Sequence, residues 1–343
     1  MPKSRKVVSL VVLGLLLAYL TFTVYAAVQV NVCIRDPLNA ANGAKGTVSN
    51  GYWVGEIPVT VTGADSSTSP QPTIAYCMNF DKTIYVGSTF GASLGAVTDS
   101  SEWRAVSYIL TWYNPPADTA GGAANQVAIW HLLNSTRGYS YYKPSWLTPV
   151  LNSAGDALAD EVLGKNVVRQ GDQLQWIEPA ISNQSGVAAD PGDTITFKAL
   201  LTDSEGTPKA GVRILFTATL APDNVQLNST YVSAFMTHTD SDGVAQVDVK
   251  VPGDVQAGQR VEVKASTRGV WPQMYLDLTD NRRQDLIGVG TCFELTVSTN
   301  LCVIGFINVV PEVPLGTLTA GVACSLAFVY WKKGGRLKQR NKP

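Results

Sequence analysis

The uncharged stretch near the C-terminus is the feature that most constrains how this chain folds. Residues 313–331 contain no charged side chain over nineteen positions, about as many as a helix needs to cross a bilayer. Six lysines and arginines and no acid follow within residues 332–343, and such basic clusters remain on the cytoplasmic side. We therefore expect a transmembrane helix at 312–331, a basic cytoplasmic tail at 332–343 and the rest of the chain outside the cell.

The N-terminus has the pattern of a cleaved export signal. Three basic residues within the first six positions precede an apolar run at 7–20, which is too short to span a bilayer comfortably. The run closes on Val24-Tyr25-Ala26, with small residues where a signal peptidase reads them. We expect a signal peptide at 1–26 and a single-pass cell-surface protein whose N-terminus lies outside.

The part of the chain between these two ends is acidic. It holds all 27 acids but only 17 of the 26 bases, because nine bases lie in the two ends. An acidic surface repels phosphate backbones, which argues against nucleic acid as a partner. In an exported chain the three Asn-x-Ser/Thr sequons are candidate glycosylation sites: Asn134, Asn183 and Asn228.

Hydrophobic periodicity divides the exported part into an α+β head, residues 27–180, and an all-β region after it. In the head, alternating residues predict strands, apolar residues at three- and four-residue spacing predict helices, and residues 173–179 read as a strand and exit linker. The expected strands are 28–32, 52–54 and 57–61, and the expected helices are 102–113, 123–133 and 147–162.

From residue 187 onward the pattern predicts strands alone. Short alternating runs at 194–200, 212–218, 244–251 and 260–265, separated by turn residues, indicate a β-sandwich over residues 181–269. Residues 270–311 are expected to form a β-rich membrane-proximal segment. It should contain two strands, 293–297 and 303–310, around a turn at 298–300.

The sandwich region resembles a bacterial Ig-like domain of the invasin type. The resemblance rests on turn glycines and apolar residues in a fixed order, over about eighty residues. It implies a stalk module without a reactive site of its own. Residues 311–316 are similar to the tails of archaeal surface proteins, which implies an archaeal source. The residues that carry the Ig-like resemblance are Pro191-Gly192-Asp193, Phe197, Asp203, Gly206, Pro208, Gly211-Val212, Phe216, Thr239-Asp240, Asp242-Gly243, Ala245 and Val247.

Five cysteines leave two pairings to consider. Cys324 falls in the apolar stretch, where it serves as a small apolar side chain. Cys292 and Cys302 flank the expected turn, which favours a local disulfide in an oxidising compartment. Composition alone would also pair Cys33 with Cys77 in the head.

A second resemblance concerns Cys77. A Tyr76-Cys77 pair, then a helix ending in aromatic residues and Pro115-Pro116, then a helix with Gln126-x-Ala-Ile-Trp130, resembles the thioester domains of bacterial surface adhesins. The match covers most of residues 50–165. It implies that the Cys77 sulfur and the Gln126 side-chain carbonyl join as an internal thioester. The sequence departs from the family at Asn125, where Thr is usual.

Thioester chemistry requires a dry, ordered site, since water would hydrolyse the product. Nearby aromatic residues are candidates for the dry wall: Tyr76, Trp112 and Trp130. Asn79 and Asn125 could donate a hydrogen bond to the acyl oxygen. His131 follows Gln126 by five residues, which turns it about 140° around a helix and away from the carbonyl.

Two functional hypotheses remain open at this stage. The first is a covalent adhesin that captures an amine-bearing partner, such as a lysine of another surface protein. The second is a non-covalent surface-binding or envelope structural protein with a Cys33–Cys77 disulfide. An enzyme is not expected, and neither is a cofactor or metal. The chain has only two histidines, and it lacks Cys-x-x-Cys, a Gly-rich phosphate loop and a Ser elbow.

Overall fold

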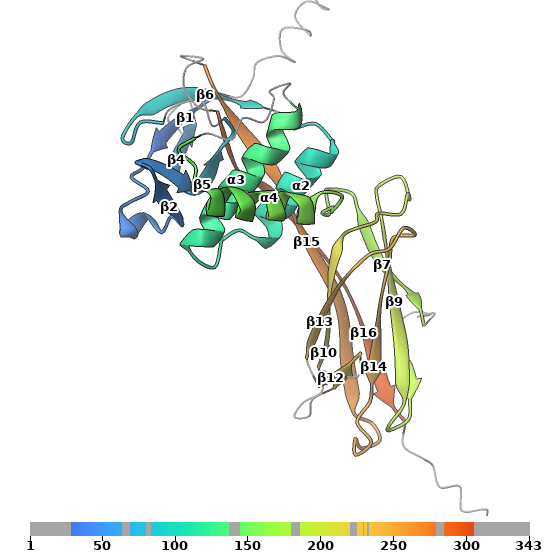
Figure 1. Cartoon of the computed structure of the whole chain (residues 1–343). Helices are drawn as coiled ribbons and strands as arrows, with labels where there is room; N and C mark the ends of the chain where they lie inside the picture. Colours follow the sequence, from blue (N-terminus) through green and yellow to red (C-terminus); the bar gives the residue numbers. More distant parts are fainter. Residues whose placement is uncertain are drawn as a thin grey trace, which may run out of the picture.

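The computed structural model is mostly β-sheet, with three α-helices in its described part (Figure 1). The expected signal peptide, transmembrane helix, tail and Asn183 lie outside the described residues, as does the side chain of Asn134. Within the described part, no helix is both long and apolar enough to cross a membrane. The structure describes residues 29–63, 69–79, 84–95, 97–136, 145–179, 186–219, 225–228, 230–231, 233–278 and 285–304.

The first half of the chain forms a head of strands and helices, and its order agrees with the sequence prediction. Each of the expected strands and helices in this half has a counterpart. The strands are β1 (Gln29–Ile34), β2 (Gly46–Ser49), β3 (Tyr52–Gly55), β4 (Ile57–Gly63), β5 (Gln71–Cys77) and β6 (Thr89–Gly95). The helices are the 3-10 turn η1 (Ala40–Asn42), α2 (Ser101–Trp112), α3 (Thr119–Thr136) and α4 (Pro149–Val162).

The second half of the chain contains only strands among its described elements. Two of them, β15 and β16, are far longer than the others. The strands are β7 (Gln173–Glu178), β8 (Val187–Ala189), β9 (Thr194–Thr202), β10 (Arg213–Thr219), β11 (Gln226–Leu227), β12 (Thr230–Tyr231), β13 (Ala234–His238), β14 (Val244–Lys250), β15 (Arg260–Asp277) and β16 (Leu286–Val303).

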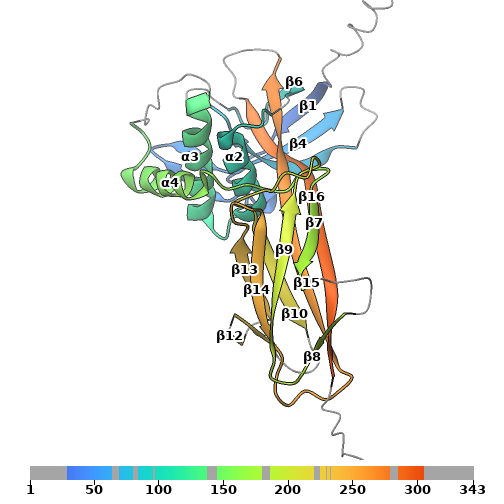
Figure 2. The same cartoon turned by 90° about the vertical axis from the view of Figure 1, so that its right-hand side faces the viewer.

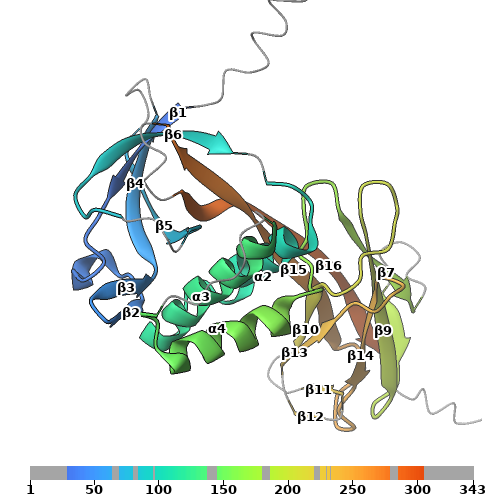
Figure 3. The same ribbon diagram turned by 45° about the horizontal axis from the view of Figure 1, so that its top comes forward.

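Local sequence signals explain where the helices begin. The Ser100 side chain accepts a hydrogen bond from the Trp103 amide at the start of α2, and the Thr148 side chain does the same for Leu151 at the start of α4. Pro149 occupies the first turn of α4, where its missing amide hydrogen costs nothing. The apolar faces of the three helices pack together beside the head strands (Figure 3).

The head strands close into an antiparallel barrel. The pairings run β15–β6, β6–β1, β1–β4, β4–β5, β5–β16 and β16–β15, so each strand bonds to the next and the last returns to the first. Closure removes exposed strand edges. The inward side chains of the ring form one apolar cluster that includes Val32, Val59 and Cys77.

The long hairpin β15–β16 belongs to both halves of the molecule (Figures 1 and 2). Each strand has 18 residues, about 60 Å when extended. At the turn end, Met274–Asp277 pair with β6 and Leu286–Gly288 pair with β5. At the other end the same strands pair with β10 and β8. The register shifts between Trp271 and Pro272, where the hairpin passes from one domain to the other.

The expected domain boundaries are therefore wrong in two places. Met274–Asp277 and Leu286–Gly288 pair with head strands β6 and β5, so they belong to the head barrel rather than to a separate membrane-proximal segment. Residues 173–178 form β7, which pairs with β9 in the second domain, so the head ends before them. The error has a physical cause. The barrel closes with strands that follow β5 and β6 by many residues in the chain, Leu286 opposite Cys77 and Tyr275 opposite Leu94, and hydrophobic periodicity does not show which distant strands pair.

The second domain is a β-sandwich, as the sequence predicts. A five-stranded sheet, ordered β12-β11-β14-β9-β7, faces β13, β10, β15, β16 and β8 of the large sheet. Alternating side chains from both sheets fill the space between them, including Phe197, Ile214, Val247 and Val263. The last described strand ends at the tip of the sandwich farthest from the head (Figure 2).

The expected Cys292–Cys302 disulfide is wrong. Both cysteines lie on the continuous strand β16, with Cys292 opposite Val270 and Cys302 opposite Arg260. Ten residues of extended chain separate their Cα atoms by about 33 Å, whereas a disulfide needs them within about 7 Å. The residues Ser298-Thr299-Asn300, read as a turn, form ladder pairs with β15 instead.

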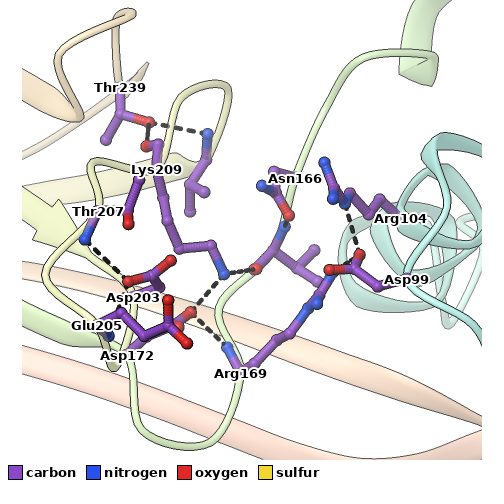
Figure 4. Close-up of polar contacts among 12 residues, drawn as sticks. Asp99, Arg104, Asn166, Arg169, Asp172, Asp203, Glu205, Thr207, Lys209 and Thr239 are labelled. Carbon is purple, nitrogen blue, oxygen red and sulfur yellow. Dashed lines mark hydrogen bonds and ion pairs between the residues drawn. The ribbon is translucent and has the colours of Figure 1, made fainter.

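Charged residues form ion pairs between the head and the sandwich at one side of the hairpin (Figure 4). Asp99, in the loop before α2, accepts hydrogen bonds from Arg104 and from Arg169, whose guanidinium groups hold its pKa well below the ordinary value. Lys209 Nζ lies 2.6 Å from Asp172 Oδ2, and both side chains are almost fully buried. These groups line a cavity of about 680 Å³. These charged groups form ion pairs with one another, so we interpret the cavity as part of the contact between the two domains and not as a ligand site.

The shared hairpin predicts that the head is not an independent folding unit. A fragment of residues 27–180 lacks β15 and β16, which leaves the edges of β5 and β6 unpaired. We expect this fragment to show no cooperative unfolding in scanning calorimetry, whereas residues 27–304 unfold cooperatively. A cooperative transition in the shorter fragment would contradict the closed barrel.

The buried Lys209–Asp172 pair predicts a large cost for removing one partner. Lys209→Ala should lower the free energy of unfolding by about 3 kcal/mol, because Asp172 is left buried without its cation. The matched control is Lys198→Ala, which breaks a more exposed pair with Glu178 and should cost less than about 1 kcal/mol. Urea unfolding measures both. Equal effects would show that burial does not decide the cost.

Candidate functional site

The structure brings Cys77 and Gln126 into direct contact. Cys77 is the last residue of β5, and Gln126 lies within α3. The Cys77 amide donates to Gln126 Oε1 at 2.8 Å, and Gln126 Nε2 donates to the Cys77 carbonyl, also at 2.8 Å. Gln126 is 1% exposed and Cys77 8%. The side-chain carboxamide of one residue is thus held on the backbone of the other, away from bulk water.

The position where β4 begins explains why the backbone groups of Cys77 are available to hydrogen-bond with a side chain. Successive residues of an antiparallel strand direct their backbone groups to opposite edges. The Met78 amide donates to the Asp285 carbonyl on the β16 edge, so Cys77 directs its own groups toward β4. However, β4 begins at Ile57, which lies opposite Ala75. No β4 residue faces Cys77, and the Gln126 carboxamide takes the place of that missing strand.

A buried polar network lies behind the contact, and Tyr76 is its centre. Adjacent side chains on a strand point to opposite faces, so Tyr76 points away from the barrel cluster that holds Cys77. Its hydroxyl lies 3.1 Å from Asn114 Oδ1 and 3.4 Å from both Glu56 Oε1 and Asn125 Nδ2. Burial raises the pKa of Tyr76, and the Glu56 carboxyl raises it further.

Asn125 does not have its predicted role. Its Nδ2 donates to the Tyr113 carbonyl at 2.8 Å and to the Tyr76 hydroxyl, so it is not aimed at the acyl oxygen. The donor to the Gln126 oxygen is the Cys77 amide instead. Asn79 follows β5, and no hydrogen bond joins it to Gln126 among the described residues.

The predicted aromatic residues divide between two places. Trp130, one helical turn after Gln126, packs in the same apolar cluster as Cys77 and meets Trp146 edge to face at 6.0 Å. Trp112 lies elsewhere, at the junction, where Arg213 and Arg268 of the sandwich strands stack over its ring at 5.1 and 4.9 Å. Trp112 therefore contributes to the contact between the domains and not to the candidate site.

His131 is directed away from the contact, as its position on the helix predicts. Its Nδ1 lies 2.8 Å from Asp156 Oδ1 on α4. The pair joins two helices on their outer side, and both side chains are partly exposed. Nothing in this geometry gives His131 a part in chemistry at Gln126.

The Cys33–Cys77 disulfide is incompatible with the barrel. Cys33 lies opposite Thr60 of β4, and Thr60 lies opposite Pro72 of β5, five residues before Cys77. Two strand spacings and five residues of extended chain place the two Cα atoms roughly 19 Å apart. Cys33 also alternates with Val32 and Ile34, which point into the cluster that contains Cys77. The structural basis of the second hypothesis is thereby removed.

Sequence reasoning missed two parts of this site. The first is the Cys77 amide, a backbone group without any sequence signature. The second is Glu56, which is 2% exposed and accepts a hydrogen bond from the Lys45 amide at 2.7 Å. A lone acid between β-rich runs is a weak signal, although an acid within a Trp-Val-Gly-Glu-Ile run could have been flagged as unusual for a buried stretch. Burial raises the pKa of Glu56, and the Lys45 and Tyr76 groups offset this in part.

The arrangement suits a condensation between the two side chains. A backbone N–H on the carbonyl oxygen polarises the carboxamide and would stabilise negative charge on that oxygen during attack. The amide nitrogen is held by the Cys77 carbonyl, which fixes the orientation of the group that must leave. Among the described residues, no cluster of histidine, cysteine or acids could hold a metal ion.

Comparison with known proteins finds no match to a family model or a curated protein, and it finds similar solved structures, two of which are described here. The Bacillus anthracis TIE protein is 15% identical with a TM-score of 0.29, over 76% of this chain and 48% of that one. The thioester domain of the Enterococcus faecium TIE86 protein is 12% identical with a TM-score of 0.29, over 80% of this chain and 96% of that one.

These similarities are weak. This chain spans about half the length of the Bacillus protein, and at TM-scores below 0.5 the likeness carries no argument about activity. The geometry at Cys77 and Gln126 is therefore the feature of this chain that bears on its function.

The contact predicts a measurable contribution of Gln126 to stability. In a Cys77→Ala background, where no thioester can form, Gln126→Met removes both hydrogen bonds and leaves a buried backbone amide and carbonyl without partners. We expect the free energy of unfolding to fall by about 2 to 4 kcal/mol relative to Cys77→Ala alone. Urea denaturation of the two proteins provides the comparison. A change below 1 kcal/mol would mean that the carboxamide does not complete the strand edge.

Proposed function

We propose that this protein captures amine-bearing partners covalently through an internal thioester between Cys77 and Gln126. The Cys77 sulfur attacks the Gln126 carbonyl carbon, the carbon–nitrogen bond breaks, and the thiol proton leaves with the nitrogen as ammonia. The observation that supports this most directly is the pair of hydrogen bonds that holds the Gln126 carboxamide on residue 77.

Positioning is what makes such a reaction feasible. A carboxamide is a poor electrophile, and a thiol attacks it only when the two groups are held together. Fixing both groups on a folded scaffold can contribute about 7–11 kcal/mol toward the barrier. Cys77 lies on a barrel strand and Gln126 on a packed helix, both rigid elements. The barrel and helices therefore supply the order that the free side chains lack.

Burial then protects the product. The thioester would form beside Trp130 and the apolar barrel interior, where water is largely excluded. A primary amine, such as the side chain of a lysine, attacks the acyl carbon. The carbon–sulfur bond breaks, Cys77 regains a proton as its thiol, and an amide joins Gln126 to the partner. Each molecule reacts once, so this is capture and not enzymatic turnover.

The arrangement of the domains fits a surface adhesin. The sandwich separates the head from the end of the described chain (Figure 2), and the sequence after that end has the pattern of a membrane anchor. We infer that the head is displayed outward on an Ig-like stalk. The anchor, the archaeal source and the use of the sequons, including Asn228 on the sandwich, remain predictions from the sequence.

Intact-mass measurement tests the proposal. The exported part, residues 27–304, should be lighter than its sequence by one ammonia, and methylamine should add its full mass at Gln126. Cys77→Ala should have the full sequence mass and form no adduct, because the nucleophile is gone.

Cys33→Ala is the matched control on a neighbouring barrel strand. Cys33→Ala should still be lighter by one ammonia, and reductant should not change the mass of the parent protein or of Cys33→Ala. A parent protein with its full sequence mass and no methylamine adduct would rule out covalent capture.

A further inference from the structure

Glu56 is a buried acid that contacts the Tyr76 hydroxyl, and that hydroxyl also contacts Asn125. Glu56 lies between β3 and β4, where its amide donates to the Lys45 carbonyl and its carboxyl receives the Lys45 amide. Trp53 Nε1 donates to the Glu56 carbonyl at 2.8 Å. The residue is thus fixed on its backbone and on one carboxyl oxygen. Its other oxygen faces Tyr76.

Tyr76 and Asn125 connect this acid to the two reactive residues. Tyr76 immediately precedes Cys77, and Asn125 immediately precedes Gln126. The Tyr76 hydroxyl contacts Glu56 and Asn125 together, so one hydroxyl joins the strand that holds the sulfur to the helix that holds the carboxamide. Tyr76 and Asn125 are candidates for positioning, because each one is held in this network one residue before a reacting residue.

With the Asn114 amide oxygen directed at Tyr76, the number of hydrogens in the network favours a protonated Glu56. The Tyr76 hydroxyl has one hydrogen, yet it lies near two acceptors, Glu56 Oε1 and Asn114 Oδ1. If Glu56 is ionised, one of these acceptors is left without a donor. If Glu56 carries a proton on Oε1, it donates to Tyr76, Tyr76 donates to Asn114, and Asn125 Nδ2 donates to Tyr76. The Tyr76 hydroxyl and the two oxygens that it faces then each have a hydrogen-bond partner.

We propose that Glu56 is a positioning residue for the condensation of Cys77 with Gln126, acting as a neutral carboxylic acid that donates to Tyr76. This inference rests on the proposed function. The nearby titratable groups are Tyr76 on β5 and Lys45 before β2, and Lys45 is the cation that opposes the neutral state. Burial opposes the charge more strongly, and it raises the pKa of Glu56 above the ordinary 4.5.

A neutral buried acid gives a defined pH dependence. Above pH 4.5 the unfolded chain has lost this proton, whereas the folded protein still retains it. The contribution of Glu56 to the free energy of unfolding is therefore fully present below pH 4.5, and it is lost as the pH rises through the folded-state pKa. Glu56→Gln keeps the donor and the acceptor without an ionisable proton. The part of this fall that is due to Glu56 should therefore be absent in the variant.

The experiment compares the parent with Glu56→Gln and Tyr76→Phe, following ammonia loss by intact mass during refolding between pH 6 and 9. At pH 6, Glu56→Gln should lose ammonia within about twofold of the parent rate. Tyr76→Phe, which keeps the buried ring but lacks the hydroxyl, should be at least tenfold slower. The ratio of parent to Glu56→Gln rates should fall as the pH rises, because only the parent ionises in the network.

Two outcomes would overturn the assignment. A tenfold or greater loss of rate in Glu56→Gln at unchanged stability would make the carboxyl a proton-transfer group. A parent-to-variant ratio that rises with pH, or that stays constant at a value far from one, would mean that Glu56 is ionised across this range, with the Asn114 amide reversed; a constant ratio near one means that it stays neutral. If no protein loses ammonia, the proposed function fails by itself. The unfolding free energies of Cys77→Ala with and without Glu56→Gln then test the neutral acid separately across the same pH range.

Discussion

The pairing of β15 with β16 is the constraint on which the remaining structure depends. One hairpin of two 18-residue strands supplies two walls of the head barrel and two central strands of the sandwich. Because its strands are continuous, the two domains cannot rotate freely about a linker. The charged contacts around Asp99 and Lys209 add to this connection on one side.

The hairpin also determines which edge of Cys77 is open. β16 occupies one edge of β5, so the backbone groups of Cys77 face the edge where β4 has not yet begun. An unpaired amide and carbonyl in a buried place would cost stability. The Gln126 carboxamide removes that cost by pairing with both. The feature that stabilises the fold is thus the same one that holds an acyl group beside a sulfur atom.

Part of this site was predictable from particular residues. The apolar spacing of Trp103, Val106, Ile109 and Leu110 predicts α2 within one residue, and the Cys77 and Gln126 motifs identified the two residues that meet. The environment was not predictable in the same way. Trp112 and Asn125 lie close to the motif in sequence, but a helix directs adjacent side chains to different neighbours. Contact with the sandwich and with Tyr76 decided their roles.

The sequence by itself determined the local elements, because side-chain periodicity and capping act over a few residues. It also determined the two apolar ends, the acidic region between them and the identity of the candidate pair. Only the tertiary structure decided that the barrel closes with strands from the far end of the chain, that the cysteine pairings at 33–77 and 292–302 do not exist, and that Glu56 lies behind the site. These features depend on backbone groups and strand edges that come together from distant parts of the chain. Almost every residue has the same backbone N–H and C=O groups, so the sequence gives no signal for which of them will pair.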